Sequence, residues 1–199
     1  IADIDASGVA GVFTASVDGD DLNGPFTFVG GDGGAVLTLD DFAEGAHVID
    51  GGAGGVTLVI DWGTIDLSSA TLTNVTSVVL NDGATLTITM DQADVIGAEN
   101  FSLADGASTA TLNLEGLSDQ VFALANYEDG ITITLTLAND PVVTLNPATD
   151  LTGISGLVVP EGTLLQLTAA QFQQLDGDGS ITGDGSVHIT DMTQADVGE

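Results

Sequence analysis

Six aspartates in two glycine-rich segments are the side chains of this sequence best suited to binding a metal ion. The segments are "VDGDDLNG" at 17–24 and "LDGDGSITGDGS" at 175–186. The six residues are Asp18, Asp20, Asp21, Asp176, Asp178 and Asp184. Calcium takes several carboxylate and carbonyl oxygens from a flexible turn, so we predict calcium as the cofactor. The alternative interpretation is a solvated Asp-Gly turn, because aspartate also favours turns through bonds to its own backbone.

Two strand-like segments carry threonine at every second position. The residues are Thr85, Thr87 and Thr89 in "TLTIT", and Thr132, Thr134 and Thr136 in "ITITLTL". Alternation places each set on one face of its strand. Flat threonine arrays of this kind resemble ice-binding surfaces. The simpler interpretation is that threonine suits a half-exposed strand.

Enzymatic chemistry has little support in the sequence. A carboxylate pair could hydrolyse glycosides, but among 30 acidic residues some pair falls at a suitable distance by chance. Lyases of the β-helix type use Arg or Lys as the base, and this chain has neither. His47 and His188 are far apart in β-like segments, and Trp62 and Tyr127 are too few for a sugar-stacking platform. We predict no enzyme, no catalytic residues and no bound organic cofactor.

Charge narrows the possible partners. Thirty Asp and Glu face no Lys or Arg, giving a formal net charge of −30 over 199 residues. Without cationic side chains the chain cannot neutralise nucleic-acid phosphates or anionic membranes. Size scaling gives a mean spacing of about 17 Å between charges. The Debye length is about 8 Å in 0.15 M salt and about 30 Å in 0.01 M salt, so we expect divalent cations or salt to stabilise the fold.

The chain contains no cysteine, which excludes disulfides and thiolate chemistry. No run of 18 apolar residues is present, so we expect no membrane insertion. The segment "IADIDASG" lacks the features of a secretion signal, and we expect any such signal to lie outside this sequence.

Short β-type segments follow one another along the chain, each rich in Val, Ile, Leu and Thr. They span 12–17, 26–29, 35–39, 56–60, 77–80, 84–89, 110–114, 131–137, 141–145, 156–159, 163–168 and 186–190. Gly, Asp and Asn turns separate them, which is typical of all-β proteins. We expect only two short helical segments, near 89–97 and 168–177, each capped by Thr at its start and Gly at its end.

An internal repeat joins these elements. Residues 72–97 align without gaps to the segment 151–177, starting at its first residue, at an offset of 79, with matches that include Gly83 and Gly162, Thr89 and Thr168, and Gln92 and Gln171. Recurring strand units with glycine turns favour a right-handed parallel β-solenoid, or β-helix. A β-sandwich is the alternative. We expect one repetitive β domain over 1–199, either a segment of a larger protein or one protomer of an assembly.

Two glycine clusters, "GGDGG" at 30–34 and "GGAGG" at 51–55, each precede a predicted strand, and we expect them to turn corners through positive φ angles. They resemble the calcium-binding nonapeptide G-G-x-G-x-D-x-apolar-x of secreted bacterial RTX proteins. Ala35 and Val56 stand where that motif has its ligand Asp. The segment from 175 also resembles the start of an EF-hand loop, although Ile181 replaces its glycine and its final Glu is missing.

The wider sequence pattern, including "IDASG" and the segment 167–191, resembles that of large bacterial surface proteins such as S-layer proteins, adhesins and matrix proteins. The resemblance implies secretion, calcium-dependent folding and a structural or adhesive role. We therefore expect an extracellular, self-associating building block of a surface layer, matrix fibre or adhesin stalk. A module that binds ice or a glycan is the main alternative, and a glycan-active enzyme is a distant third.

Overall fold

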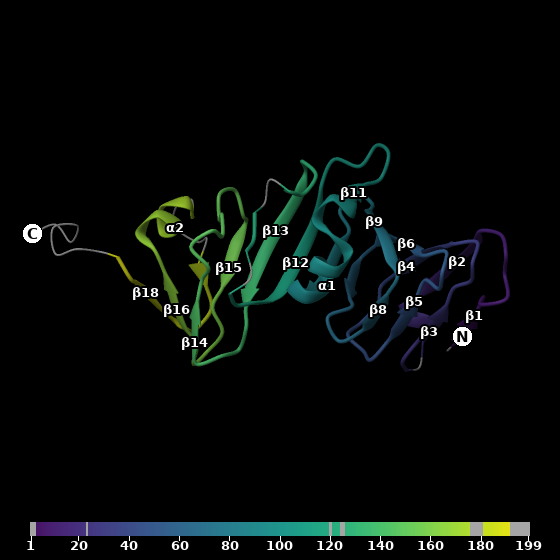
Figure 1. Ribbon diagram of the computed structural model, residues 1–199, viewed down its shortest axis with the longest axis horizontal. Helices are drawn as coiled ribbons and strands as arrows, with labels where there is room; N and C mark the ends of the chain where they lie inside the picture. The colour runs from purple at the N-terminus through teal and green to yellow at the C-terminus, as the bar shows by residue number, and fades with distance from the viewer. Residues whose placement is uncertain (1–2, 23, 120, 124–125, 176–180, 192–199) are drawn as a thin grey trace, which may run out of the picture. The chain divides into compact units, whose positions relative to one another are not determined.

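The computed structural model describes residues 3–22, 24–119, 121–123, 126–175 and 181–191. The chain is mostly β, with parallel sheets and few helices, which confirms the expected β class (Figure 1). It forms two compact units. The first comprises Ile1–Asn113 and Tyr127–Thr132, and the second comprises Leu114–Asn126 and Ile133–Glu199.

The first unit contains eleven strands, one α-helix and two short 3-10 helices in its described part. The strands are β1 (Asp3–Asp5), β2 (Phe13–Asp18), β3 (Thr27–Val29), β4 (Ala35–Asp40), β5 (Val48–Asp50), β6 (Val56–Trp62), β7 (Thr64–Asp66), β8 (Thr71–Thr73), β9 (Val75–Leu80), β10 (Thr85–Thr89) and β11 (Phe101–Leu103). The helices are η1 (Gly19–Asp21), α1 (Met90–Ile96) and η2 (Ala98–Asn100).

Two strands have residues in both units, and the other described elements of the second unit follow them. The two shared strands are β12 (Ala110–Leu117) and β13 (Ile131–Leu137). The remaining elements are β14 (Val142–Thr144), β15 (Gly156–Val158), β16 (Leu164–Leu167), α2 (Ala169–Gln174), β17 (Ile181–Thr182) and β18 (Ser186–Ile189).

In the first unit, each strand pairs in parallel with a strand at a nearly constant separation along the chain. The sheet β1-β3-β5-β8 places Asp3, Thr27, Val48 and Thr71 side by side, so the residue number rises by 24, then 21, then 23. We call this difference the step. The sheet β2-β4-β6-β9-β11 and the pair β7-β10 have similar steps. Figure 1 shows β2, β4, β6 and β9 side by side.

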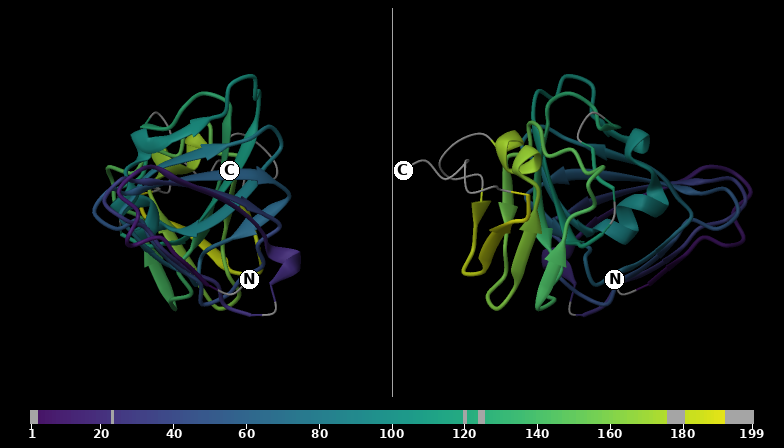
Figure 2. Two further views of the ribbon diagram at one scale, coloured as in Figure 1. Left: turned by 90° about the vertical axis from the view of Figure 1, so that its right-hand side faces the viewer. Right: turned by 60° about the vertical axis from the view of Figure 1, so that its left-hand side comes forward.

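The second unit follows the same rule. Thr134 of β13 lies beside Gly156 of β15, and β15 lies beside β17 at a similar step. The strands β14, β16 and β18 also repeat at one step, and they lie side by side in the right-hand view of Figure 2. Every strand pair whose register is defined in the described residues is parallel. The antiparallel hairpins of a β-sandwich are not found among these pairs.

The constant step stacks apolar side chains into columns. In the first unit Leu37, Leu58, Val78 and Phe101 are successive partners, and each is at most 1% exposed. In such columns a side chain covers its neighbours above and below. Each fully buried apolar side chain contributes about 1.5–3 kcal/mol, so the columns supply the main stabilising free energy of the sheets.

The two glycine clusters lie against each other at a corner of the first unit. Gly54 donates its N–H to the carbonyl of Gly31 at 3.0 Å. A Cβ on Gly30 would lie 2.4 Å from the carbonyl oxygen of Gly51. Gly34, Gly52 and Gly55 do have positive φ angles, as expected. The other glycines of the clusters are required by close backbone approach instead, because a Cβ on any of them would lie 2.5 Å or less from a backbone atom of a neighbouring segment.

The sequence identified the longer strands and both helices. All twelve predicted segments overlap a strand, whereas the short strands β1, β5, β7, β8, β11 and β17 were not predicted. Thr89 and Thr168 cap the two helices as expected, and Gly97 ends the first. The second helix has Leu175 as its C-cap, while the expected Gly177 lies outside the described residues.

One glutamine in each copy of the repeat joins a helix to an earlier segment of the chain. Gln92 accepts the N–H of Thr89 at 2.7 Å, completing a capping box at the start of α1. Its Nε2 group donates to the carbonyls of Leu67 at 2.9 Å and Ala70 at 2.7 Å. We call this arrangement the glutamine bracket.

The second bracket lies at the equivalent positions of the other repeat copy. Gln171 accepts the N–H of Thr168 at 3.0 Å and donates to the carbonyls of Asn146 at 2.8 Å and Thr149 at 3.4 Å. Gln171 is only 2% exposed. The internal repeat found in the sequence is therefore also a repeat of hydrogen bonds.

The bracket predicts the effect of Gln171→Glu. A glutamate still accepts the Thr168 N–H, but its second oxygen faces two carbonyls and cannot donate. We expect a loss of about 2–4 kcal/mol in the free energy of unfolding at pH 7. Urea titration at pH 7 and pH 4.5 measures it, and the loss becomes smaller at the lower pH because a protonated carboxyl regains a donor.

Thr168→Ala is the matched control. It removes the threonine side chain of the capping box and leaves the two donated bonds of Gln171 in place, so we expect a loss of about 1 kcal/mol that is the same at both pH values. Equal losses in the two variants would show that the donated bonds add nothing beyond the cap.

Thr163 provides a second prediction. Its side chain is 2% exposed and its Oγ1 has no hydrogen-bond partner, whereas the equivalent residue in the other repeat is the fully buried Ala84. A buried hydroxyl without a partner costs about 1–3 kcal/mol. We therefore expect Thr163→Val to raise the free energy of unfolding by about 1 kcal/mol in urea titration. The reverse change, Ala84→Thr, is expected to lower it, and a stabilised Ala84→Thr variant would contradict this explanation.

Candidate functional site

Three of the six predicted calcium ligands lie together at the end of β2. Asp18 caps η1, and its Oδ1 accepts the N–H of Asp20 at 2.9 Å. Asp21 is the last residue of η1. The bond between Asp18 and Asp20 is the local turn bond that the alternative interpretation predicted. Asp18 thus has a structural role whether or not it also binds a cation.

The same turn bond recurs at other aspartates. In each case the carboxylate accepts the backbone N–H two residues later, at 2.9 to 3.0 Å. The pairs are Asp5 with Ser7, Asp50 with Gly52, Asp66 with Ser68, and Asp150 with Thr152. Hydrogen bonding to Ser7 and Thr152 lowers the pKa values of Asp5 and Asp150, because it favours the ionised form.

Asp40 brings further carboxylates to the Asp18 turn. It is the ladder partner of Asp18, and its Oδ1 is buried without a hydrogen-bond partner. Burial raises the pKa of Asp40 first, and the charges of Asp41, Asp18, Asp61 and Asp20 raise it further. We call these five residues, with Asp21, the acidic corner.

Asp40, Asp41 and Asp61 were not among the predicted ligands. A signal was present, because Asp18, Asp40 and Asp61 each come after an alternating apolar run, at a nearly constant spacing. Asn81 continues this spacing and donates its Nδ2 to Asp61. The spacing of the strands, once known, places these polar residues at one corner.

Of the other three predicted ligands, only Asp184 lies in the described part of the chain. Asp184 lies in the turn between β17 and β18, while Asp176 and Asp178 lie outside the described residues. Within the described part of the chain, no three acidic or histidine side chains are placed so that they could hold one metal ion. Calcium binding by the six aspartates remains a prediction.

The degenerate RTX positions are occupied by core residues. Ala35 is 6% exposed and Val56 is fully buried, and both begin strands that face the apolar columns. An apolar side chain therefore replaces the ligand in both turns, and these turns act in packing.

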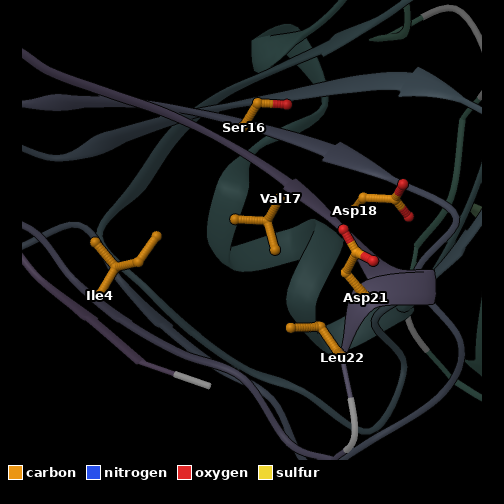
Figure 3. A pocket seen from close by; sticks show the side chains of 6 residues that line it. All are labelled: Ile4, Ser16, Val17, Asp18, Asp21 and Leu22. Carbon is orange, nitrogen blue, oxygen red and sulfur yellow. The ribbon is translucent and has the colours of Figure 1, made fainter. Parts of the chain in front are cut away.

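A cavity of about 130 Å³ opens beside the acidic corner in the first unit. Ile4, Val17 and Leu22 supply its apolar lining, and Asp18 and Asp21 lie at one side (Figure 3). The remaining lining residue is Ser16. The cavity lies between the outermost strands β1 and β2 of two sheets.

The threonine rows extend only in part from strand to strand, since Thr85 lies beside Thr64 of β7 but Thr87 lies beside Asp66. Thr87 is only 7% exposed and accepts a hydrogen bond from Asn113 at 3.2 Å. Thr134 and Thr136 lie beside Gly156 and Val158 of the neighbouring strand. The flat array that an ice-binding surface needs is therefore interrupted at Thr87, Thr134 and Thr136.

The two histidines have different environments. His47 is 6% exposed, and its Nδ1 accepts the N–H of Phe26 at 3.0 Å, so its Nε2 carries the proton and donates to Ala43 at 3.2 Å. Its ring packs against Phe42 at 5.2 Å. His188 is exposed on β18, as the sequence predicted. His47 is therefore a core residue.

Two aromatic residues considered for sugar binding also differ. Trp62 is 64% exposed. Tyr127 is half-buried and packs against Phe101 at 5.7 Å, and burial, followed by the charge of Asp94, raises its pKa to about 12. Among the ring contacts of the described residues, none joins Trp62 to Tyr127.

Comparison with known protein families, curated proteins and solved structures finds no match to this chain. None of the helices in the described residues has the length and apolar character needed to cross a membrane.

The acidic corner predicts that Asp40→Asn stabilises the fold. Because folding raises the pKa of Asp40, its ionised form is less favourable in the folded chain. This penalty is absent below the ordinary aspartate pKa of about 3.9 and complete above the raised value. We expect a higher melting temperature at pH 7, no difference near pH 3, and a smaller gain in high salt because salt screens the neighbouring charges.

Asp82→Asn is the control of opposite sign. Backbone and side-chain bonds from Ser108 and Thr109 lower the pKa of Asp82. Its ionised form stabilises the fold, so the substitution is expected to lower the melting temperature at pH 7, and this loss disappears in acid. A destabilised Asp40→Asn variant at pH 7 would show that Asp40 has a favourable partner, such as a bound cation.

Proposed function

We propose that this chain is a non-catalytic structural building block of an extracellular bacterial assembly, such as a surface layer, a matrix fibre or an adhesin stalk. We propose further that its strands form a right-handed parallel β-solenoid stabilised by calcium. The observation that supports this most is the nearly constant step between parallel partners in both units. For example, Phe13 lies beside Ala35 in the first unit, and Val142 lies beside Leu164 in the second.

A constant step suits a structural role. Each layer buries its apolar side chains against the next, so stability is a sum of similar contacts between neighbours. The glutamine brackets and stacked glycine turns support the same spacing. Such a chain gains length by adding layers and needs no new core.

The charge supports a cation-rich environment. The formal net charge of −30 has no Lys or Arg to offset it. At the acidic corner, Asp40 has a raised pKa because it is partly desolvated and several carboxylates lie near it. A divalent cation would reduce this repulsion, and the resemblance to RTX and S-layer proteins favours calcium.

We expect calcium to raise the melting temperature and to promote ordered assembly. A ligand that binds only the folded state stabilises it by about 2.7 kcal/mol at 100 times its Kd. Melting is compared in millimolar calcium and in chelator at constant high ionic strength. The same samples are imaged by negative-stain microscopy, where filaments or sheets are expected with calcium.

Magnesium at equal concentration is the control for general screening, because it prefers a stricter geometry and keeps its water. Identical melting temperatures in calcium, magnesium and chelator would contradict the proposed calcium sites. Monodisperse monomers at high calcium and high protein concentration would contradict the building-block role. Thermal hysteresis or glycan turnover by the purified chain would favour the alternative functions.

A further inference from the structure

The strand β2 leaves one edge of its sheet open among the described strands. It is the last strand of the order β11-β9-β6-β4-β2. Phe13 donates its N–H to Gly34 on the side of β4. Since backbone groups alternate between the two edges of a parallel strand, the N–H groups of Thr14 and Ser16 point to the open edge. Such an edge is a template for another strand.

The strand β18 leaves the opposite kind of edge open. Within the described part of the chain, it is the last strand of the order β14-β16-β18. Ser186 donates its N–H to Thr163 on the side of β16. The N–H groups of Val187 and Ile189 therefore point to the open edge. On β18, the N–H groups at the open edge belong to residues whose side chains face the core. On β2, they belong to residues whose side chains face away from the core.

These two edges complement each other. In a parallel strand pair, a residue whose N–H and C=O point to the other strand bonds to the two residues that flank the one directly opposite it. Placing Val187 beside Ala15 and Ile189 beside Val17 satisfies this rule, because the partners of Val187 and Ile189 are then flanked by Thr14, Ser16 and Asp18. The same alternation of hydrogen-bonding residues is found between β2 and β4 within the first unit.

Apolar columns end at both edges. Val17 begins a column that continues through Leu39 and Ile60, and the cavity of Figure 3 lies beside Val17. On β18, Val187 is 41% exposed, although its partner Leu165 is fully buried. Joining the two edges would bury Val187 and Ile189 against Ala15 and Val17, in the way each inner layer is buried.

Joining like edges would not continue the columns. A two-fold axis perpendicular to the sheet would join two like edges as an antiparallel pair, whereas every defined pair in the described residues is parallel. A two-fold axis along the strands turns the apolar face of one copy to the opposite side. Only unlike edges keep both the direction and the face, which makes the contact heterologous.

Charge also favours β18 as the strand that docks. The chain has no Lys or Arg, and His47 is buried. His188 is exposed on β18. In the register given above it lies beside Ser16, two residues from Asp18, where an imidazole N–H can donate to a carboxylate.

We propose that copies of this chain join head to tail by parallel strand addition, with β18 of one copy docking on β2 of the next. This interface rests on the proposed building-block role and specifies its contact. The occupant of the β2 edge is thus a second copy of the same chain.

Cysteine pairs test the register, because the natural chain has no cysteine. Thr14→Cys chains are mixed with Ser186→Cys chains under mild oxidation in calcium and moderate salt. We expect mixed disulfide dimers at least about tenfold above the yield with Val95→Cys chains, because docking raises the effective concentration to about millimolar. Val95 is 79% exposed on α1 and serves as the collision control.

Ser16→Pro tests the edge itself. Proline removes an N–H that points away from β4, and open edges tolerate proline, so the melting temperature is expected to stay close to that of the natural chain. Sedimentation velocity is expected to show assemblies for the natural chain and monomers for Ser16→Pro. The control is Ser102→Ala on β11, which lies at the other end of the sheet from β2, and this variant is expected to assemble like the natural chain.

The outcomes separate the interface from the proposed function. If the natural chain assembles, but Ser16→Pro assembles equally and the mixed disulfide stays at the collision level, this interface is wrong and the building-block role stands. If Thr14→Cys alone or Ser186→Cys alone gives the higher yield, like edges meet and the head-to-tail contact is overturned. If the natural chain stays monomeric in every condition, both proposals fail.

Discussion

The close approach of backbone to backbone at the corners is the constraint on which the rest of the first unit depends. A Cβ on Gly30, Gly51 or Gly54 would meet backbone atoms of a neighbouring turn at 2.0 to 2.4 Å. Because these turns lie in contact, the strands that follow them start level with one another. The apolar columns then form without further adjustment, since each strand buries every second residue.

The absence of Lys and Arg shapes how polar groups are satisfied. Neutral amides and short carboxylates make the bonds that ion pairs make in other proteins. The glutamine brackets join separate segments through backbone carbonyls, and aspartates hold turns through N–H groups two residues later. These bonds need no positive side chain, so a chain with 30 acidic residues can still pair its buried backbone groups.

The sequence predicts the parts of this fold and of the acidic corner that have local signals. Alternation located the longer strands, and the Thr-x-x-Gln spacing accompanied both helices. Strands as short as β5 and β17 are too short to show alternation, and each is defined by parallel pairing with strands about one step away in the sequence. Asp18, Asp20 and Asp21 are close in sequence and were identified, whereas Asp40 and Asp61 join them only through the strand register. Local composition thus indicated where acidic turns occur, and the step between strands decided which of them meet.

The aspartate turns also determine how the chain responds to acid. Hydrogen bonds lower the pKa values of Asp5 and Asp150 in these turns, and of Asp82, which accepts from Ser108 and Thr109, so these carboxylates keep accepting when carboxyls of ordinary pKa have become neutral. Acidification therefore weakens the mutual repulsion of the molecules before it breaks these hydrogen bonds. Because net charge keeps proteins in solution, the solubility of this chain is expected to fall with pH before these carboxylates stop accepting.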